Sequence, residues 1–238
     1  MRKNRIPPHS AALEPGNLLA AARRHFPCLQ GRNGVCYVAP EYAVAAQALG
    51  DLGAVQTLGR AAPPSRSRAR NRIVPLQGHR QSLHLRPQRH GGALAWLWRD
   101  YVGSPNRSLR ELEILRHLRL RGAPVPIPVL TAAKQCGGLW RVSLGTAHEE
   151  GTTNLETLLR NNPSPEWIRQ TARAVALAVR CLHDHGARHG DLHVGNILIQ
   201  NETLGDPTDQ EFAVTLVDLD RAHLSKSIGA HDRMRDLM

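Results

Sequence analysis

The chain of 238 residues has few cysteines and no long apolar run, and each shortage excludes a class of protein. Its cysteines, Cys28, Cys36, Cys136 and Cys181, form no CxxC pair, which argues against a disulfide framework and against a structural zinc site. No stretch approaches the roughly 18 to 20 apolar residues of a membrane-spanning helix. Residues 1–10 are not followed by the apolar block of a secretory signal. We therefore expect a cytosolic protein that can touch a membrane from the inside.

Lysine is also scarce, so arginine supplies nearly all of the positive charge. The only lysines are Lys3, Lys134 and Lys226, and Lys134 is expected in a solvated hairpin turn. Lys and Arg together number 31 against 20 Asp and Glu, a formal net charge of +11. Such an excess implies an anionic partner, whether nucleic acid, nucleotide, phosphorylated metabolite or acidic membrane, although biased codon usage could also produce it. Aromatic residues make up only 4%, which disfavours the base stacking of a nucleic-acid binder.

The chain divides into two halves, and it contains no internal repeat. Residues 1–50 are rich in alanine and leucine and give weak structural signals, so their role stays open. Residues 145–154 contain two glycines and few apolar groups, and we place the boundary between the halves there. The predicted units are therefore 1–50, 51–147 and 148–238.

Antiparallel strands are predicted in the first half. Short β-like runs lie at residues 72–76 and 81–85, separated by turn residues. Residues 129–144 can form a hairpin that turns around residues 135–138, which include two consecutive glycines.

Apolar spacing predicts two helices. The first covers residues 106–121 and stops at Gly122, and Glu111 lies near its inward face. The carboxylate of Glu111 is therefore directed at the core or at a buried cation. The second helix follows Ser164, which can cap it, and Pro165 suits its first turn.

The segment after the second helix carries the candidate chemistry. Two apolar runs, residues 197–199 and 214–217, predict a hairpin of two strands. Asp191 and Asn196 precede the first strand, and Asp218 follows the second. The hairpin therefore brings these three side chains to the same end.

One amide and two carboxylates gathered at one point suit magnesium, which prefers few carboxylates together with phosphate oxygens and water. Phosphoryl transfer needs one carboxylate to orient the attacking hydroxyl and accept its proton, and an Asn and an Asp to hold the metal. A zinc-type hydrolytic centre is the alternative, because His183, His185, His189 and His193 crowd into the same stretch. Their spacing fits neither HExxH nor HxHxDH. His183 and His185 are expected to end a helix without a functional role.

These residues carry a resemblance to a known family. The run His189-Gly-Asp-Leu-His-Val-Gly-Asn-Ile-Leu, followed some 20 residues later by a strand ending in Asp218, resembles the catalytic loop and metal-binding Asp of the protein-kinase-like superfamily. Asp218-Leu-Asp220-Arg221 resembles the Asp-Phe-Asp-Arg of the lipopolysaccharide core kinases, particularly the 3-deoxy-D-manno-octulosonic acid (Kdo) kinases.

Upstream residues resemble the same family. Leu85-Arg86-Pro-Gln-Arg89-His-Gly91-Gly92 is similar to its Leu-Arg-His-Tyr-Arg-Arg-Gly-Gly. Arg107-Ser-Leu-Arg-Glu111, followed by the proline-rich residues 122–128, is similar to its helix and helix exit. The matches together span residues 57–224.

The resemblance implies an α+β, bilobal protein-kinase-like fold. Residues 51–147 would form a small N-lobe built on an antiparallel sheet, and residues 148–238 a shortened, mainly helical C-lobe with the catalytic loop and the metal-binding Asp.

The resemblance also implies roles for the site residues. Asp191 becomes the catalytic base, Asn196 and Asp218 become the metal ligands, and Glu111 pairs with the cation that anchors phosphate. That cation is Arg86, at a position where most kinases have lysine. Arginine is permanently charged and can grip phosphate oxygens in a bidentate fashion, so the exchange is chemically plausible.

Further residues take supporting roles. His189 is expected to brace the catalytic loop, and His193 to touch a phosphate or the acceptor sugar. Asp220 and Arg221 support the site from the segment after the metal ligand. The glycine-rich cover of the nucleotide is degenerate, because the run Gly59-Arg60-Ala-Ala-Pro-Pro has prolines where glycines would be expected.

The implied function is that of a phosphotransferase that uses ATP and Mg²⁺. The resemblance implies transfer of the γ-phosphoryl group to the 4-hydroxyl of a Kdo residue on a lipid A precursor, in lipopolysaccharide core biosynthesis. This acceptor is an anionic, lipid-linked sugar, which suits a basic peripheral protein at the cytosolic face of the inner membrane.

Two other classes of protein stay open. Another small-molecule kinase, such as an aminoglycoside or choline kinase, or a protein kinase would share every catalytic residue, and only residues 86–92 and 220–221 argue against it. An inactive pseudokinase or a basic binding protein is supported by the missing lysine and the poor glycine loop. The presence of Asp191, Asn196 and Asp218 together argues against inactivity.

Overall fold

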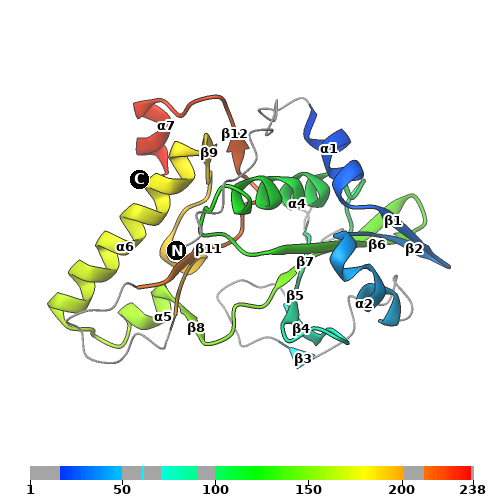
Figure 1. Ribbon diagram of the computed structural model, residues 1–238, viewed down its shortest axis with the longest axis horizontal. Coiled ribbons are helices and arrows are strands. Elements are labelled where there is room, and N and C mark those ends of the chain that lie inside the picture. The colour runs from blue at the N-terminus through cyan, green and yellow to red at the C-terminus, as the bar shows by residue number, and fades with distance from the viewer. Residues whose placement is uncertain (1–16, 50–59, 62–70, 90–99, 201–211, 237–238) are drawn as a thin grey trace, which may run out of the picture.

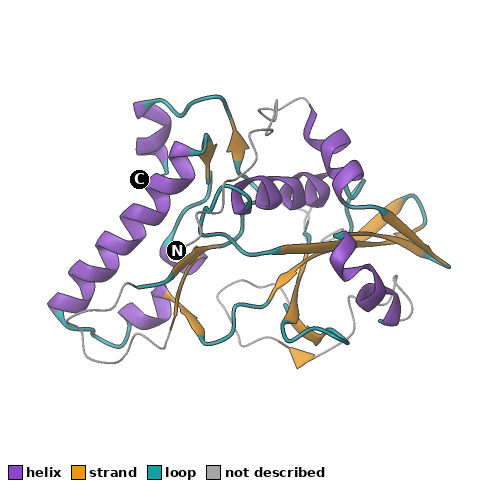
Figure 2. Ribbon diagram, in the orientation of Figure 1, coloured by secondary structure: helices purple, strands orange, loops and turns teal. Residues whose placement is uncertain are grey.

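Two lobes make up the computed structural model (Figure 1), which describes residues 17–49, 60–61, 71–89, 100–200 and 212–236. A large sheet with helix α4 forms the N-lobe, and helices α5, α6 and α7 gather with short strands in the C-lobe (Figure 2). No helix in the described ranges is both long enough and apolar enough to cross a membrane.

The sheet of the N-lobe is antiparallel and has seven strands, in the order β1-β2-β6-β7-β5-β4-β3. The strands are β1 (Cys28–Gly31), β2 (Gly34–Val38), β3 (Arg60–Ala61), β4 (Arg72–Pro75), β5 (Ser82–Pro87), β6 (Pro128–Cys136) and β7 (Leu139–Ala147). The predicted runs at 72–76 and 81–85 are the paired strands β4 and β5, and the predicted hairpin is β6–β7.

The turn of the β6–β7 hairpin is tighter than predicted. It consists of Gly137 and Gly138, and Gly137 has a φ of 63°. Because glycine adopts positive φ without steric cost, two residues suffice for the turn. The prediction that Lys134 lies in the turn is therefore wrong: Lys134 lies within β6, opposite Arg141.

Residues 17–49 extend this sheet and cover it. Strand β2 pairs with β6 from Gly34↔Lys134 to Val38↔Leu130. Helix α1 (Leu18–His25) packs on α4, and the short turn η2 (Pro40–Tyr42) and helix α2 (Ala43–Ala48) follow β2. Buried residues of this segment belong to the same hydrophobic core as those of strands β4 to β7.

Helix α4 (Asn106–Arg119) confirms the first predicted helix, although it ends two residues earlier. Its end is set by Gly122, whose φ is 79°, and by a hydrogen bond from the Ala123 N–H to the Leu118 carbonyl. The helix buries its leucines against β6 and β7, and Glu111 is buried with them, at 3% exposure of the residue.

The C-lobe is built around helix α6 (Pro165–Asp184). The Ser164 side chain caps this helix as predicted, accepting a hydrogen bond from the Trp167 N–H at 3.2 Å. The other elements are β8 (Thr152–Asn154), α5 (Leu155–Leu159), β9 (Ala187–Arg188), η4 (Val194–Asn196), β10 (Ile197–Gln200), β11 (Val214–Leu216), β12 (His223–Leu224) and α7 (Ala230–Arg235). The predicted hairpin of two strands is confirmed as the antiparallel pair β10–β11.

Candidate active site

The β10–β11 hairpin gathers the three residues that the sequence singled out. Ile197 of β10 lies opposite Leu216 of β11, so Asn196 and Asp218 flank the same end of the pair. The Asn196 side-chain Nδ2 donates to the backbone carbonyl of Asp191 at 3.0 Å, and the Asn196 carbonyl accepts from the Val217 N–H at 3.0 Å. These bonds tie the loop that carries Asp191 to the segment that leads from β11 to Asp218.

The backbone of Asp218 adopts a left-handed conformation, with a φ of 67°. Asp and Asn tolerate this region better than other residues that carry a Cβ. The preceding carbonyl, that of Val217, lies 3.0 Å from Nε2 of His189, a residue with no exposed surface. His189 therefore links the start of the loop that carries Asp191 to the residue before Asp218.

Arg86 joins the two lobes at this point. On the N-lobe side, Arg86 Nη2 lies 2.5 Å from Glu111 Oε1 and 2.6 Å from Oε2. On the C-lobe side, Arg86 Nη1 lies 2.9 Å from Asp218 Oδ1 and 3.9 Å from Asp220 Oδ2. Arg107, in the first turn of α4, donates to the same Oδ2 of Asp220. The structure thus brings Arg86, Glu111, Asp218 and Asp220 together.

Carboxylates outnumber guanidinium groups in this cluster. Burial would lower the pKa of Arg86, but Glu111, Asp218 and Asp220 outweigh burial and raise that pKa, so Arg86 stays charged. Burial raises the pKa of Glu111, and Asp218 and Asp220 raise it further, against the opposing effect of Arg86. Burial and Asp218 likewise raise the pKa of Asp220. Burial is thus the larger cause of the raised carboxyl pKa values, and repulsion among the carboxylates, which an added cation would relieve, adds to it.

The residues present fit a magnesium ion. The Asn196 Nδ2 faces the Asp191 carbonyl, so Oδ1 is the end of the amide left for a cation. With the Asp218 carboxylate, which is one-third exposed, Oδ1 supplies the hard oxygen donors that Mg²⁺ prefers, and the surplus negative charge favours a divalent cation. Among the described residues, no group of three or more His, Cys, Asp or Glu side chains is placed to hold a metal ion.

Asp236, just after helix α7, is a site residue that the sequence did not reveal. Its Oδ2 accepts from the His189 N–H at 2.7 Å and lies 3.0 Å from His183 Nε2, and its Oδ1 accepts from the Gly190 N–H at 2.8 Å. Burial would raise the pKa of Asp236, but these hydrogen bonds outweigh burial and lower it. His183 lies in the last turn of α6, as predicted, and its buried side chain lies against this carboxylate.

The remaining predicted residues lie around this cluster. His193 Nδ1 accepts from the Gly195 N–H at 3.1 Å and so caps the turn η4. Arg221 Nη1 lies 3.8 Å from Asp191 Oδ1. Gly59 is outside the described residues, and Arg60 lies in β3, where only the backbone is described.

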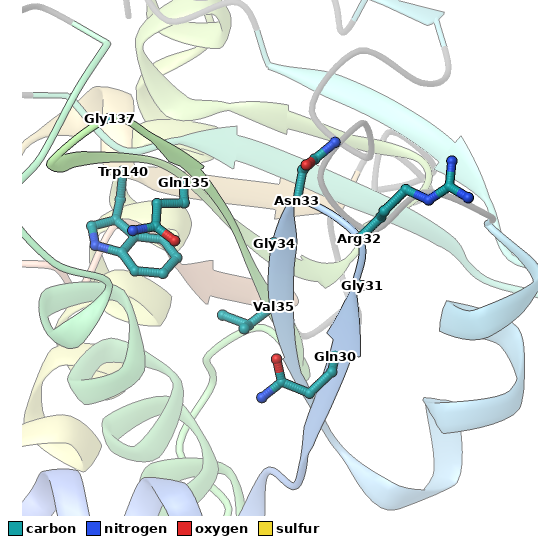
Figure 3. A pocket seen from close by; sticks show the side chains of 9 residues that line it. All are labelled: Gln30, Gly31, Arg32, Asn33, Gly34, Val35, Gln135, Gly137 and Trp140. Carbon is teal, nitrogen blue, oxygen red and sulfur yellow. The ribbon is translucent and has the colours of Figure 1, made fainter.

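A groove of about 360 Å³ lies away from this cluster, between the tips of the β1–β2 and β6–β7 hairpins (Figure 3). Arg32, Asn33 and Trp140 are among its lining residues, and no predicted site residue lines it. The groove therefore plays no part in the candidate active site.

Comparison with solved structures supports the fold. A structure described as WaaP in complex with acyl carrier protein matches with a TM-score of 0.52 and 19% identity, over 78% of this chain and 71% of that chain. At this identity the likeness concerns the fold alone. It confirms the predicted α+β, protein-kinase-like architecture, with the antiparallel sheet in one lobe.

Comparison of sequences gives the family. A 3-deoxy-D-manno-octulosonic acid kinase of Xylella fastidiosa (strain M12) is 32% identical over 144 residues, which are 59% of this chain and 53% of that protein. The kinase of the same name from Vibrio cholerae serotype O1 is 31% identical over 145 residues, 59% of this chain and 56% of that protein. The match thus spans about half the length of these curated relatives. The model of the lipopolysaccharide kinase (Kdo/WaaP) family matches residues 66–238, and the chain belongs to this family.

Proposed function

We propose that this chain is an ATP-dependent kinase that transfers the γ-phosphoryl group to a hydroxyl of a Kdo sugar. The observation that carries the proposal is the contact of Arg86 with both Glu111 and Asp218. This contact sets a permanent cation from the N-lobe beside the end of the hairpin that gathers Asp191 and Asn196. The names of the curated relatives support Kdo as the sugar.

Each residue of the cluster has a distinct task in this proposal. Asp191 orients the acceptor hydroxyl and takes its proton while the hydroxyl oxygen bonds to the γ-phosphorus and the bond to the ADP oxygen breaks. Arg86 holds phosphate oxygens, and Glu111 fixes the direction of Arg86. Asn196 and Asp218 would hold Mg²⁺, which neutralises phosphate charge when bound.

The finer assignment concerns the acceptor and the place of action. The acceptor proposed is the 4-hydroxyl of Kdo on a lipid A precursor, reached by peripheral contact of the protein with the anionic cytosolic face of the inner membrane. The formal net charge of +11 supports an anionic acceptor and an anionic surface. We also propose that the nucleotide binds between two lobes, one made of residues 51–147 with the packed segment 17–49 and the other of residues 148–238.

The test is an assay of purified protein with Mg-ATP and Kdo-bearing lipid A precursor, beside aminoglycosides, choline and a generic protein substrate. Asp191→Ala should abolish transfer while circular dichroism and the melting temperature stay unchanged, because the Asp191 side chain is 43% exposed. Arg169→Ala, at an exposed position of α6, is the matched control and should keep full activity. Transfer to a panel member alone would refute the Kdo assignment. Absence of both transfer and ATP binding would refute the kinase assignment.

A further inference from the structure

Arg221 is the exposed cation beside the proposed catalytic base. Its Nη1 lies 3.8 Å from Asp191 Oδ1, and the side chains of Arg221 and Asp191 are 63% and 43% exposed. A long contact between two exposed groups is worth at most about 1 kcal/mol. An incoming anion can therefore displace Asp191 as the partner of the Arg221 guanidinium with little loss of free energy.

The backbone of Arg221 is held firmly even though its side chain is exposed. The φ of Gly190 is 78°, and a Cβ at Gly190 would lie 2.4 Å from the Arg221 carbonyl oxygen, so only glycine permits this close approach. The same carbonyl lies 2.8 Å from His223 Nδ1, and His223 pairs with Arg188 where β12 meets β9. The base of the Arg221 side chain is thus fixed against the catalytic loop.

The neighbouring arginines are committed to other groups. Arg86 is occupied by Glu111 and Asp218, and Arg107 donates to Asp220. Arg188 is mostly buried and lies 3.6 Å from Asp232. Within the described part of the site, Arg221 is therefore the guanidinium best placed to meet a ligand that presents its hydroxyl to Asp191.

We propose that Arg221 binds the carboxylate of the same acidic sugar whose hydroxyl Asp191 deprotonates, which makes Arg221 a specificity-determining residue for the acceptor. The proposal rests on the proposed function. An octulosonic acid carries its carboxylate and its hydroxyls on one sugar unit. Two adjacent side chains of opposite charge can therefore bind it together, Arg221 at the carboxylate and Asp191 at a hydroxyl. A guanidinium binds a carboxylate with paired, charge-assisted hydrogen bonds that a neutral sugar cannot make.

The experiment compares two acceptors, the Kdo-bearing lipid A precursor and the same molecule with the Kdo carboxyl converted to its methyl ester. Arg221→Ala should lower kcat/KM for the free acid by about 10- to 100-fold, as expected for loss of a hydrogen bond between charged groups. The loss should appear mainly in the KM for the acceptor, while the KM for ATP stays constant. For the ester, wild type and Arg221→Ala should perform alike, and Arg221→Lys should recover part of the preference for the free acid.

The ratio between the acceptors decides the proposal. If Arg221→Ala weakens transfer to acid and ester equally, Arg221 acts only through Asp191 or the loop, and the proposal is overturned. An unchanged kcat/KM for the free acid would overturn it as well. Failure of the proposed function gives a different result, because wild type would then phosphorylate neither acceptor. Arg169→Ala serves as the control that retains the wild-type ratio.

Discussion

Arginine at position 86 can do what a lysine at the same place cannot. Its Nη2 contacts both oxygens of Glu111 while its Nη1 lies 2.9 Å from Asp218. A lysine offers a single nitrogen, so it would have to divide one ammonium between two carboxylates that lie on opposite sides. The planar guanidinium therefore carries the connection between helix α4 and the end of strand β11.

The two substitutions of Arg86 should impair the use of ATP to different degrees. Arg86→Ala should abolish transfer, because the cluster loses its central cation. Arg86→Lys should keep the charge but lower kcat/KM for ATP by about 10- to 100-fold, the loss typical of one charge-assisted hydrogen bond. Steady-state kinetics with varied ATP measure this loss, and circular dichroism checks the fold. An Arg86→Lys variant as active as wild type would show that the second nitrogen has no role.

His84 makes stability depend on pH. It lies on β5 and stacks with His148 at a ring distance of 6.2 Å. Burial, together with the charges of His148 and Arg86, lowers the pKa of His84 to about 4. Because an unfolded histidine titrates near pH 6.5, the unfolded state binds more protons between that pH and pH 4. The contribution of His84 to the unfolding free energy is thus fully present above pH 6.5 and is lost as the pH falls toward 4.

His84→Gln should therefore reduce the dependence of stability on pH. Urea unfolding at several values from pH 7.5 to pH 4.5 should show a smaller loss of unfolding free energy for the variant than for wild type, by an amount on the order of 1–3 kcal/mol. His117, whose pKa is also lowered to about 4, stays in both proteins and accounts for part of the remaining slope. An equal dependence of the unfolding free energy on pH in the two proteins would contradict the lowered pKa of His84.

At the scale of elements, the residue after helix α7 holds the loop that carries Asp191 through one side chain. Asp236, next to α7, accepts from two consecutive backbone N–H groups, those of His189 and Gly190, and contacts His183 at the end of α6. One carboxylate thereby ties α6, α7 and the catalytic loop together. The conformation of this loop therefore depends on a contact from the end of helix α7.

Asp236→Ala should loosen this junction. Two buried groups, the His189 N–H and His183 Nε2, and the partly buried Gly190 N–H would lose their acceptor, and each orphaned buried donor costs about 1–3 kcal/mol. We expect a clearly lower urea midpoint and a kcat reduced more than the KM for ATP. Asp232→Ala is the matched control, because Asp232 lies in α7 but is about half exposed. If Asp236→Ala kept the wild-type kcat, the junction would be purely structural.

The elements found from the sequence are those whose signals are local. Helix α4 was readable from its leucine spacing and Gly122, and the β10–β11 hairpin from two apolar runs beside polar residues. Helix α1 and strands β1 and β2 were not predicted, because short alanine-rich and glycine-containing segments fit several structures. They become defined only by packing on α4 and pairing with β6.

The residues of the candidate site likewise include some that the sequence predicts and one that it does not. Asp191, Asn196 and Asp218 could be read from their motif, and the position of Glu111 from its helix. Asp236 could not, because its partners lie 46 to 53 residues away in the sequence and no motif surrounds it. The role of a buried acid of this kind is determined by tertiary contacts, and these leave no local pattern in the sequence.

At the scale of the whole molecule, the positive charge should govern attachment to surfaces. With a formal net charge of +11, the protein should bind vesicles that contain anionic phospholipid and should leave vesicles of neutral lipid unbound. Raising the ionic strength should release it, since salt screens exposed charges. Co-sedimentation at two or more salt concentrations measures the effect. Binding that is insensitive to salt would leave the charge excess without this role.

The hairpin formed by β1 and β2 has a consequence for solubility. Residues Val129–Ala133 of β6 are all buried, and without β2 their backbone N–H and C=O groups would line an open edge of the sheet. Such an edge is a template on which another chain can add a strand and begin to aggregate. The edge that remains on this side of the sheet is β1, which has only four residues, so it offers a poor template. The N-terminal hairpin therefore shields the lobe that carries Arg86 and Glu111 from misassembly.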